Sequence, residues 1–223
     1  MIYILPILAV VLSFIFVYLV RPQAKEYYKL FLAFSGAFLL ALTIFELLPE
    51  IYENTNSRHI GVFIMFGILF QIFLEFFSKG AEHGHVHFSV ENANFPWLLF
   101  ISICIHSLLE GLPIVNNDTI IYGILIHKVP IAIILSIFLI GSKLKLQNAI
   151  FFMLVFSMMT PLGTYLADNV DLLLQYSSIL NALVIGVFFH ISTIILFESS
   201  EGHKFNLRKL IVIVAGIVIA YFL

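Results

Sequence analysis

The chain is poor in charged residues. Only 11% of its 223 residues are charged, whereas 61% are hydrophobic, and the mean hydropathy is +1.08. Soluble domains carry about 25% charged and about 45–50% apolar residues. The composition therefore excludes a soluble enzyme, a nucleic-acid binder and a disordered protein. It predicts an integral membrane protein that lies in a lipid bilayer.

Cysteine and clustered positive charge are also scarce. The single cysteine, Cys104, cannot form an internal disulfide. Eleven Lys and Arg against thirteen Asp and Glu give a net charge of −2, with no basic arm for a nucleic acid. Residues 1–20 lack the positively charged start of a cleaved signal peptide. We therefore expect residues 2–20 to be a retained first span.

Long apolar stretches predict the fold. A helix needs about 20 apolar residues to cross a bilayer, and eight stretches approach that length. Transmembrane β-strands need only about 9–11 residues and alternate in polarity. We therefore expect an all-α integral membrane protein, a single transmembrane domain over 1–223 with eight transmembrane helices. The stretches are 2–20, 29–49, 60–78, 95–115, 119–140, 148–167, 176–198 and 208–223.

The positions of Lys and Arg predict the orientation. Nine of the eleven fall in alternate loops, which the positive-inside rule places in the cytoplasm. We expect a multi-pass protein of the cell membrane with both termini extracellular or periplasmic, and a cytoplasmic histidine-containing loop at 79–94. Arg58 falls on the other side, and Lys128 lies within a span. The nine are Arg21, Lys25, Lys29, Lys79, Lys143, Lys145, Lys204, Arg208 and Lys209.

Ionisable residues inside spans are costly and usually mark a pathway or a site. His106 and Glu110 are four residues apart and share a helix face, and both are ligand types for a divalent metal. His127 lies in the next span at a depth that matches within roughly 3 Å, at a rise of about 1.5 Å per residue. These three residues predict a metal site. The alternative is that His106 and Glu110 form a structural hydrogen bond.

The motifs resemble those of the ZIP family of divalent-metal transporters. The family's fourth span carries His-Asn/Ser-x-x-Asp/Glu-Gly, which stands here as His106-Ser107-Leu108-Leu109-Glu110-Gly111. The stretch Glu46-Leu47-Leu48-Pro49-Glu50 is similar to the family's His-Leu-Leu-Pro-Glu, and AEHGHVH is similar to its histidine-bearing loop. The resemblance implies eight spans, both termini outside, and a transporter rather than an enzyme. Metal would then be the transported substrate and not a cofactor.

The fifth span departs from the family pattern. His-Glu-x-Pro-His-Glu stands here as His127-Lys128-Val129-Pro130-Ile131-Ala132, so three ligand positions are lost. We expect one metal position, built from His106, Glu110 and His127, with water completing the shell. Lys128 has two interpretations. It neutralises Glu110 or Glu46 while the site is empty, or it repels the ion and abolishes transport.

Other residues are candidates for the transport path. Glu46 lies near the outer mouth, Ser107 and Lys128 lie beside the ligands, and His190 lies deeper toward the cytoplasm. For His190, the alternative is a hydrogen bond to a neighbouring side chain. The loop histidines either capture metal weakly or belong to a solvated polar loop. They are His83, His85 and His87.

The expected function is transport of a divalent metal into the cytoplasm by alternating access, with zinc as the favoured metal. Zinc, iron, manganese and cobalt all accept nitrogen and oxygen ligands, so the residues alone leave the metal open. One alternative is an intramembrane zinc-dependent hydrolase, with His106, His127 and His190 as ligands and Glu110 as general base. Another is a metal-binding member of the same fold that does not transport. A homodimer is also left open.

Overall fold

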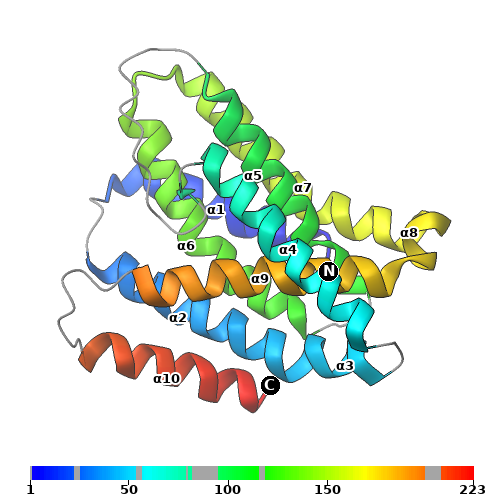
Figure 1. Cartoon of the computed structure of the whole chain (residues 1–223). Helices are drawn as coiled ribbons and strands as arrows, with labels where there is room; N and C mark the ends of the chain where they lie inside the picture. The colour runs from blue at the N-terminus through cyan, green and yellow to red at the C-terminus, as the bar shows by residue number, and fades with distance from the viewer. Residues whose placement is uncertain are drawn as a thin grey trace.

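The structure, a computed structural model, describes residues 2–22, 26–53, 57–78, 80–81, 95–115, 119–198 and 207–223. All of the regular structure in these residues is helical (Figure 1). The elements are α1 (Ile4–Val20), α2 (Glu26–Leu42), the π-helix η1 (Thr43–Leu47), α3 (Leu48–Glu53), α4 (Ser57–Ser78), α5 (Trp97–Glu110), the 3-10 helix η3 (Leu112–Val115), α6 (Ile120–Gly141), α7 (Leu146–Asn169), α8 (Asp171–Gln175), α9 (Ser177–Glu198) and α10 (Leu207–Tyr221).

Every one of the eight predicted stretches contains a helix, so the all-α prediction is confirmed for the described residues. Within the described residues, six segments are long and apolar enough to cross a membrane. The helices α1, with 17 residues, and α10, with 15, are shorter, so the count of eight spans stays a prediction. The six segments are Tyr27–Glu53, Arg58–Ser78, Trp97–Val115, Ile120–Gly141, Leu146–Asn169 and Ser177–Phe197.

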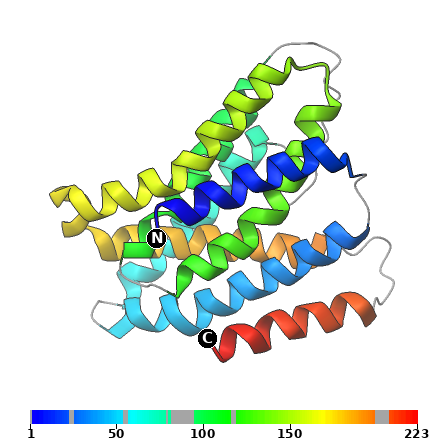
Figure 2. The same ribbon diagram turned by 180° about the vertical axis from the view of Figure 1, so that it is seen from behind.

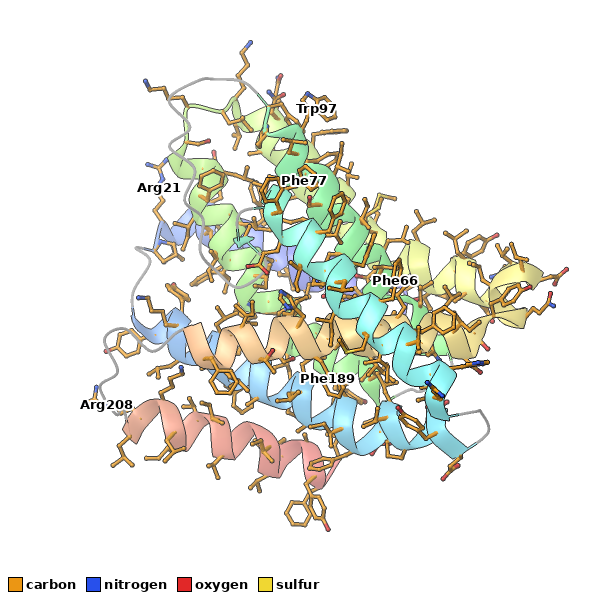
Figure 3. The ribbon with its side chains drawn as sticks, viewed as in Figure 1. Arg21, Phe66, Phe77, Trp97, Phe189 and Arg208 are labelled. Carbon is orange, nitrogen blue, oxygen red and sulfur yellow. The ribbon has the colours of Figure 1, made fainter. Side chains whose placement is uncertain are left out.

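The helices form a bundle in which α4 packs on α9, α10 packs on α2, and α1 packs on α6 and α7 (Figures 1 and 2). The two ends of the chain lie at the same end of this bundle. Tyr3 donates a hydrogen bond to Asp168 at the end of α7, at 3.4 Å, and the ring of Tyr221 packs on Phe45 near the end of α2. Arg21 and Arg208 lie at the opposite end (Figure 3).

Glycines set the distance between α5 and α7. A Cβ atom on Gly163 would lie 2.0 Å from the carbonyl oxygen of Leu108, and one on Gly111 would lie 2.1 Å from that of Thr160. Helices in a bilayer associate through close packing of this kind, because lipid supplies no hydrophobic force between them. The contact fixes α7 beside the end of α5, which carries Glu110.

Helices contain a proline or change type close to polar residues. Pro130 lies inside α6, two residues after Lys128, and Pro161 lies inside α7, next to Thr160. The second span changes from an α-helix to the π-helix η1 at Thr43 before it continues as α3. Prolines and π-turns both interrupt the regular hydrogen-bond ladder, and they are frequent at functional sites. Glu46 lies in η1 and is half-buried.

Candidate metal site

His106 and Glu110 lie one turn apart on α5, as their spacing predicts. His106 Nε2 lies 3.0 Å from Glu110 Oε1. Only 4% of His106 and 2% of Glu110 is exposed, so the pair lies inside the bundle and away from lipid. A buried carboxylate needs compensating partners, and the neighbouring helices supply them.

The helix α6 supplies the adjacent residues His127 and Lys128, both fully buried. The ring centroids of His127 and His106 are 6.4 Å apart. Lys128 Nζ donates to Glu110 Oε2 at 2.6 Å and to Ser107 Oγ at 2.9 Å. The backbones of α5 and α6 make little direct contact, so these side chains fill the space between the two helices. The two imidazoles therefore lie near each other inside the bundle.

The helix α7 contributes hydroxyl groups behind Glu110. Thr160 Oγ1 lies 2.9 Å from the carbonyl oxygen of Ser107 and 3.4 Å from Glu110 Oε2. The side-chain oxygens of Ser107 and Thr160 are 3.0 Å apart. The aromatic ring of Phe156 lies 4.7 Å from Lys128 Nζ, which is within the range of a cation–π contact. The ammonium of Lys128 therefore has a carboxylate, a hydroxyl and an aromatic face around it.

The residue Gln71 was missed by sequence reasoning. It lies on α4, is fully buried, and its Oε1 lies 3.3 Å from His106 Nδ1. A search for ionisable residues does not detect it, because its amide is uncharged. An amide in the middle of an apolar span is nevertheless also costly to bury without a partner. A search for every strongly polar residue within a span would have found it.

The side chains enclose a cavity of about 10 Å³, which is space for about one water-sized particle. Its polar lining is His106, Glu110, His127 and Lys128, and the remaining lining is apolar. Buried His127 Nδ1 has no hydrogen-bond partner among the described residues. The site therefore combines a small space with a buried imidazole nitrogen that has no hydrogen-bond partner in the described residues.

Three of these residues are spaced for one metal ion. One ligand atom from each of His106, Glu110 and His127 lies within 4.8 Å of the other two. Zinc takes such ligands at about 2.0–2.2 Å in a tetrahedron, so its ligand atoms lie about 3.4 Å apart. The ligand atoms would need to move closer to one another by up to about 1.5 Å to bind an ion, and water would fill the fourth position. The arrangement is suited to binding one divalent cation.

The structure places the other candidate residues apart from this group. His190 Nε2 on α9 lies 2.6 Å from Glu75 Oε2 on α4, which is the neighbouring hydrogen bond considered as its alternative. A zinc site made of His106, His127 and His190 is therefore not formed. Glu46 is also outside the three-residue group. The loop histidines lie outside the described residues; they are His83, His85 and His87.

Comparisons with known proteins agree with this chemistry. The sequence model of the family described as "ZIP Zinc transporter" matches residues 90–223, more than half of the chain. The chain is also similar to "Zinc transporter ZIP1" of Danio rerio, with 35% identity over 88 residues. That match covers 37% of this chain and 29% of the fish protein, so it spans less than a third of the length of that relative. The matched family region contains α5, α6 and α7.

Proposed function

This chain belongs to the ZIP zinc transporter family. We propose that it moves a divalent metal ion across the membrane into the cytoplasm, and that this ion is zinc. Members of this family are transporters and not enzymes. The observation that carries the proposal is the buried group of His106, Glu110 and His127, with ligand atoms within 4.8 Å of one another. A metal-ligand set at the centre of a helical membrane bundle is expected of a carrier, since ionisable groups there are otherwise costly.

The proposed topology has eight spans with both termini outside, in the cell membrane. The charge pattern supports it, because Arg21 and Arg208 lie at the end of the bundle opposite to the two chain ends (Figure 3). The positive-inside rule assigns that end to the cytoplasm. On this topology α1 and α10 also cross the bilayer, and a span of 17 residues lies at the lower limit of the usual range of about 17–25 residues.

In the proposed cycle, an ion enters from the outer side past Glu46 and loses water to His106, Glu110 and His127. When the bundle opens inward, the ion leaves past the pair of His190 and Glu75. This pair joins α9 to α4, and α4 also contacts the metal site through Gln71. The loop histidines at 83–87 would then receive the released ion in the cytoplasm.

The position of Lys128 is compatible with a bound ion. Its ammonium contacts Glu110 Oε2, whereas Glu110 Oε1 faces His106. An ion can therefore share Oε1 with His106 while Lys128 keeps Oε2. This supports the interpretation in which Lys128 neutralises Glu110 in the empty site and takes the place of a second cation.

The rival function is a metal binder that does not transport, and the contact between Lys128 and Glu110 is the observation that favours it. A fixed ammonium 2.6 Å from the ligand carboxylate repels an incoming cation. The two functions differ in one result. The transporter moves zinc across a sealed membrane, and the binder holds zinc without moving it.

The test is zinc uptake into proteoliposomes that contain a zinc-sensitive dye. We expect uptake by the wild-type protein and loss of it in the His106→Ala, His127→Ala double variant. His59→Ala is the matched control, because His59 is exposed at the start of α4. Uptake by the double variant at the wild-type rate would refute the site. Zinc binding without uptake by the wild type would establish the rival function.

A further inference from the structure

The helix α4 exposes many apolar side chains and buries one amide side chain, Gln71. Leu69 and Phe73 are 59% and 58% exposed, whereas Gln71, midway between them, is fully buried. Burying an amide without hydrogen bonds is costly, because the group loses its hydrogen bonds to water. A Leu at this position would avoid that cost. The presence of an amide instead indicates that Gln71 has a polar partner inside the bundle.

That partner is the ring of His106, which is held at both of its edges. Nε2 faces Glu110 Oε1 at 3.0 Å, and Nδ1 faces Gln71 Oε1 at 3.3 Å. The nitrogen on the side of Glu110 and the cavity is therefore Nε2. Gln71 contacts the other ring nitrogen, Nδ1, so its side chain does not bind the ion that Nε2 would bind.

A neutral imidazole binds a metal through one nitrogen and carries its hydrogen on the other. Metal-binding histidines usually donate this second N–H to an oxygen, which fixes the tautomer and the orientation of the ring. We propose that Gln71 is a positioning residue for metal binding: its carboxamide holds the Nδ1 edge of His106 and so directs Nε2 at the ion. This proposal rests on the proposed function, since it requires His106 to be a metal ligand.

The same role explains a polar atom that otherwise lacks a purpose. Gln71 Nε2 is buried and has no hydrogen-bond partner in the described part of the chain. As it stands, Gln71 Oε1 faces His106 Nδ1, which suits the tautomer that carries its hydrogen on Nδ1 and leaves Nε2 free for an ion. In the other tautomer, His106 Nε2 donates its hydrogen to Glu110 and Nδ1 is bare. The carboxamide can then turn its NH₂ group toward Nδ1, and it can offer its oxygen when an ion takes Nε2. An amide suits both states, whereas a group that only donates or only accepts suits one.

The test measures zinc affinity and the number of imidazole ligands in the purified full-length protein. We expect Gln71→Leu, which is similar in size, to raise the Kd for Zn²⁺ by about 10–100-fold. The bound zinc should also lose the signal of one imidazole in X-ray absorption. Gln71→Glu should keep the wild-type Kd or lower it, because a carboxylate also accepts the hydrogen of Nδ1. Gln147→Leu is the matched control, since Gln147 is exposed at the start of α7.

The outcomes separate this proposal from the function on which it rests. If Gln71→Leu retains the wild-type Kd and two imidazole ligands, Gln71 only fills space and the proposal is overturned. If Gln71→Leu does not fold, Gln71→Glu decides: a Kd more than tenfold above wild type overturns the proposal. If His106→Ala binds zinc as tightly as the wild type, the proposed site itself has failed, and the role of Gln71 fails with it.

Discussion

The two carboxylate oxygens of Glu110 have different neighbours, and this difference determines the charge of the site. Oε2 is paired with Lys128 at 2.6 Å, and Oε1 faces His106 at 3.0 Å. With neutral imidazoles the empty site has no net charge, and a divalent ion raises it to two positive charges. At an effective dielectric constant of about 20, two unit charges about 4 Å apart interact by about 4 kcal/mol. Lys128 therefore stabilises the empty site and weakens the loaded one.

Lys128→Met should reverse this balance. Removing one partner of a buried ion pair leaves an uncompensated charge and destabilises by about 3–5 kcal/mol, so the metal-free variant should unfold at a lower temperature than the wild type. Zinc should bind at least about tenfold more tightly, which corresponds to about 1.4 kcal/mol. Thermal unfolding in detergent with and without zinc measures both effects. The exposed Lys143 provides the control Lys143→Met, and equal zinc shifts in the two variants would contradict the role of Lys128.

The sequence predicts the candidate ligand residues but not the residues that contact them. His106 and Glu110 follow from a spacing of four residues, which is a local property of any helix. The match in depth of His127 follows from the length of two spans. The contact of Gln71 with His106 joins residues 35 positions apart, and it depends on how α4 and α5 pack. Local periodicity contains no information about that packing.

At the scale of elements, the contact between α5 and α7 holds the site together. The glycines Gly111 and Gly163 lie at the crossing, and each would place a Cβ within 2.1 Å of a backbone oxygen of the other helix. Glu110 directly precedes Gly111, and Thr160 lies about one turn before Gly163. The distance between the two helices therefore also sets the position of the hydroxyls behind Glu110.

Gly163→Ala should separate α5 from α7, because a backbone oxygen cannot move aside for a Cβ atom. Overpacking of this kind costs about 1–3 kcal/mol, which we expect to lower the unfolding temperature by roughly 2–10 °C and to weaken zinc binding. Gly141→Ala is the matched control, since a Cβ there meets no atom within 4 Å. Calorimetry and zinc titration of both variants are the measurements. Equal stability of the two variants would show that the crossing tolerates a wider spacing.

The elements themselves are largely predictable, and their irregular parts are not. The apolar runs predict all eight helical regions, because a span needs a long apolar segment. The π-helix at Thr43–Leu47 and the short helix Asp171–Gln175 have no counterpart in that reasoning. Both depend on how a segment packs against its neighbours rather than on its composition.

At the scale of the whole molecule, the scarce charges fall into two groups with different roles. The buried group, Glu110 and Lys128, belongs to the candidate metal site and is paired within it. The basic residues at the ends of helices are the basis of the proposed orientation in the membrane. Tyr3 contacts Asp168, so the first helix begins beside the end of α7. The N-terminus and the connection after α7 therefore lie on one side of the bundle.

That arrangement makes the proposed topology directly testable by cysteine labelling. Cys104 is the single cysteine of the chain and is buried, so Cys104→Ser gives a background without reactive thiols. In intact cells, a membrane-impermeant maleimide should label the Asp171→Cys and Leu223→Cys variants, because both positions are exposed and at the predicted outer side. It should label Lys143→Cys, between α6 and α7, only after the cells are opened. Labelling of Lys143→Cys alone in intact cells would reverse the orientation. Opposite behaviour of Asp171→Cys and Leu223→Cys would mean that one of the helices after α8 does not span the membrane.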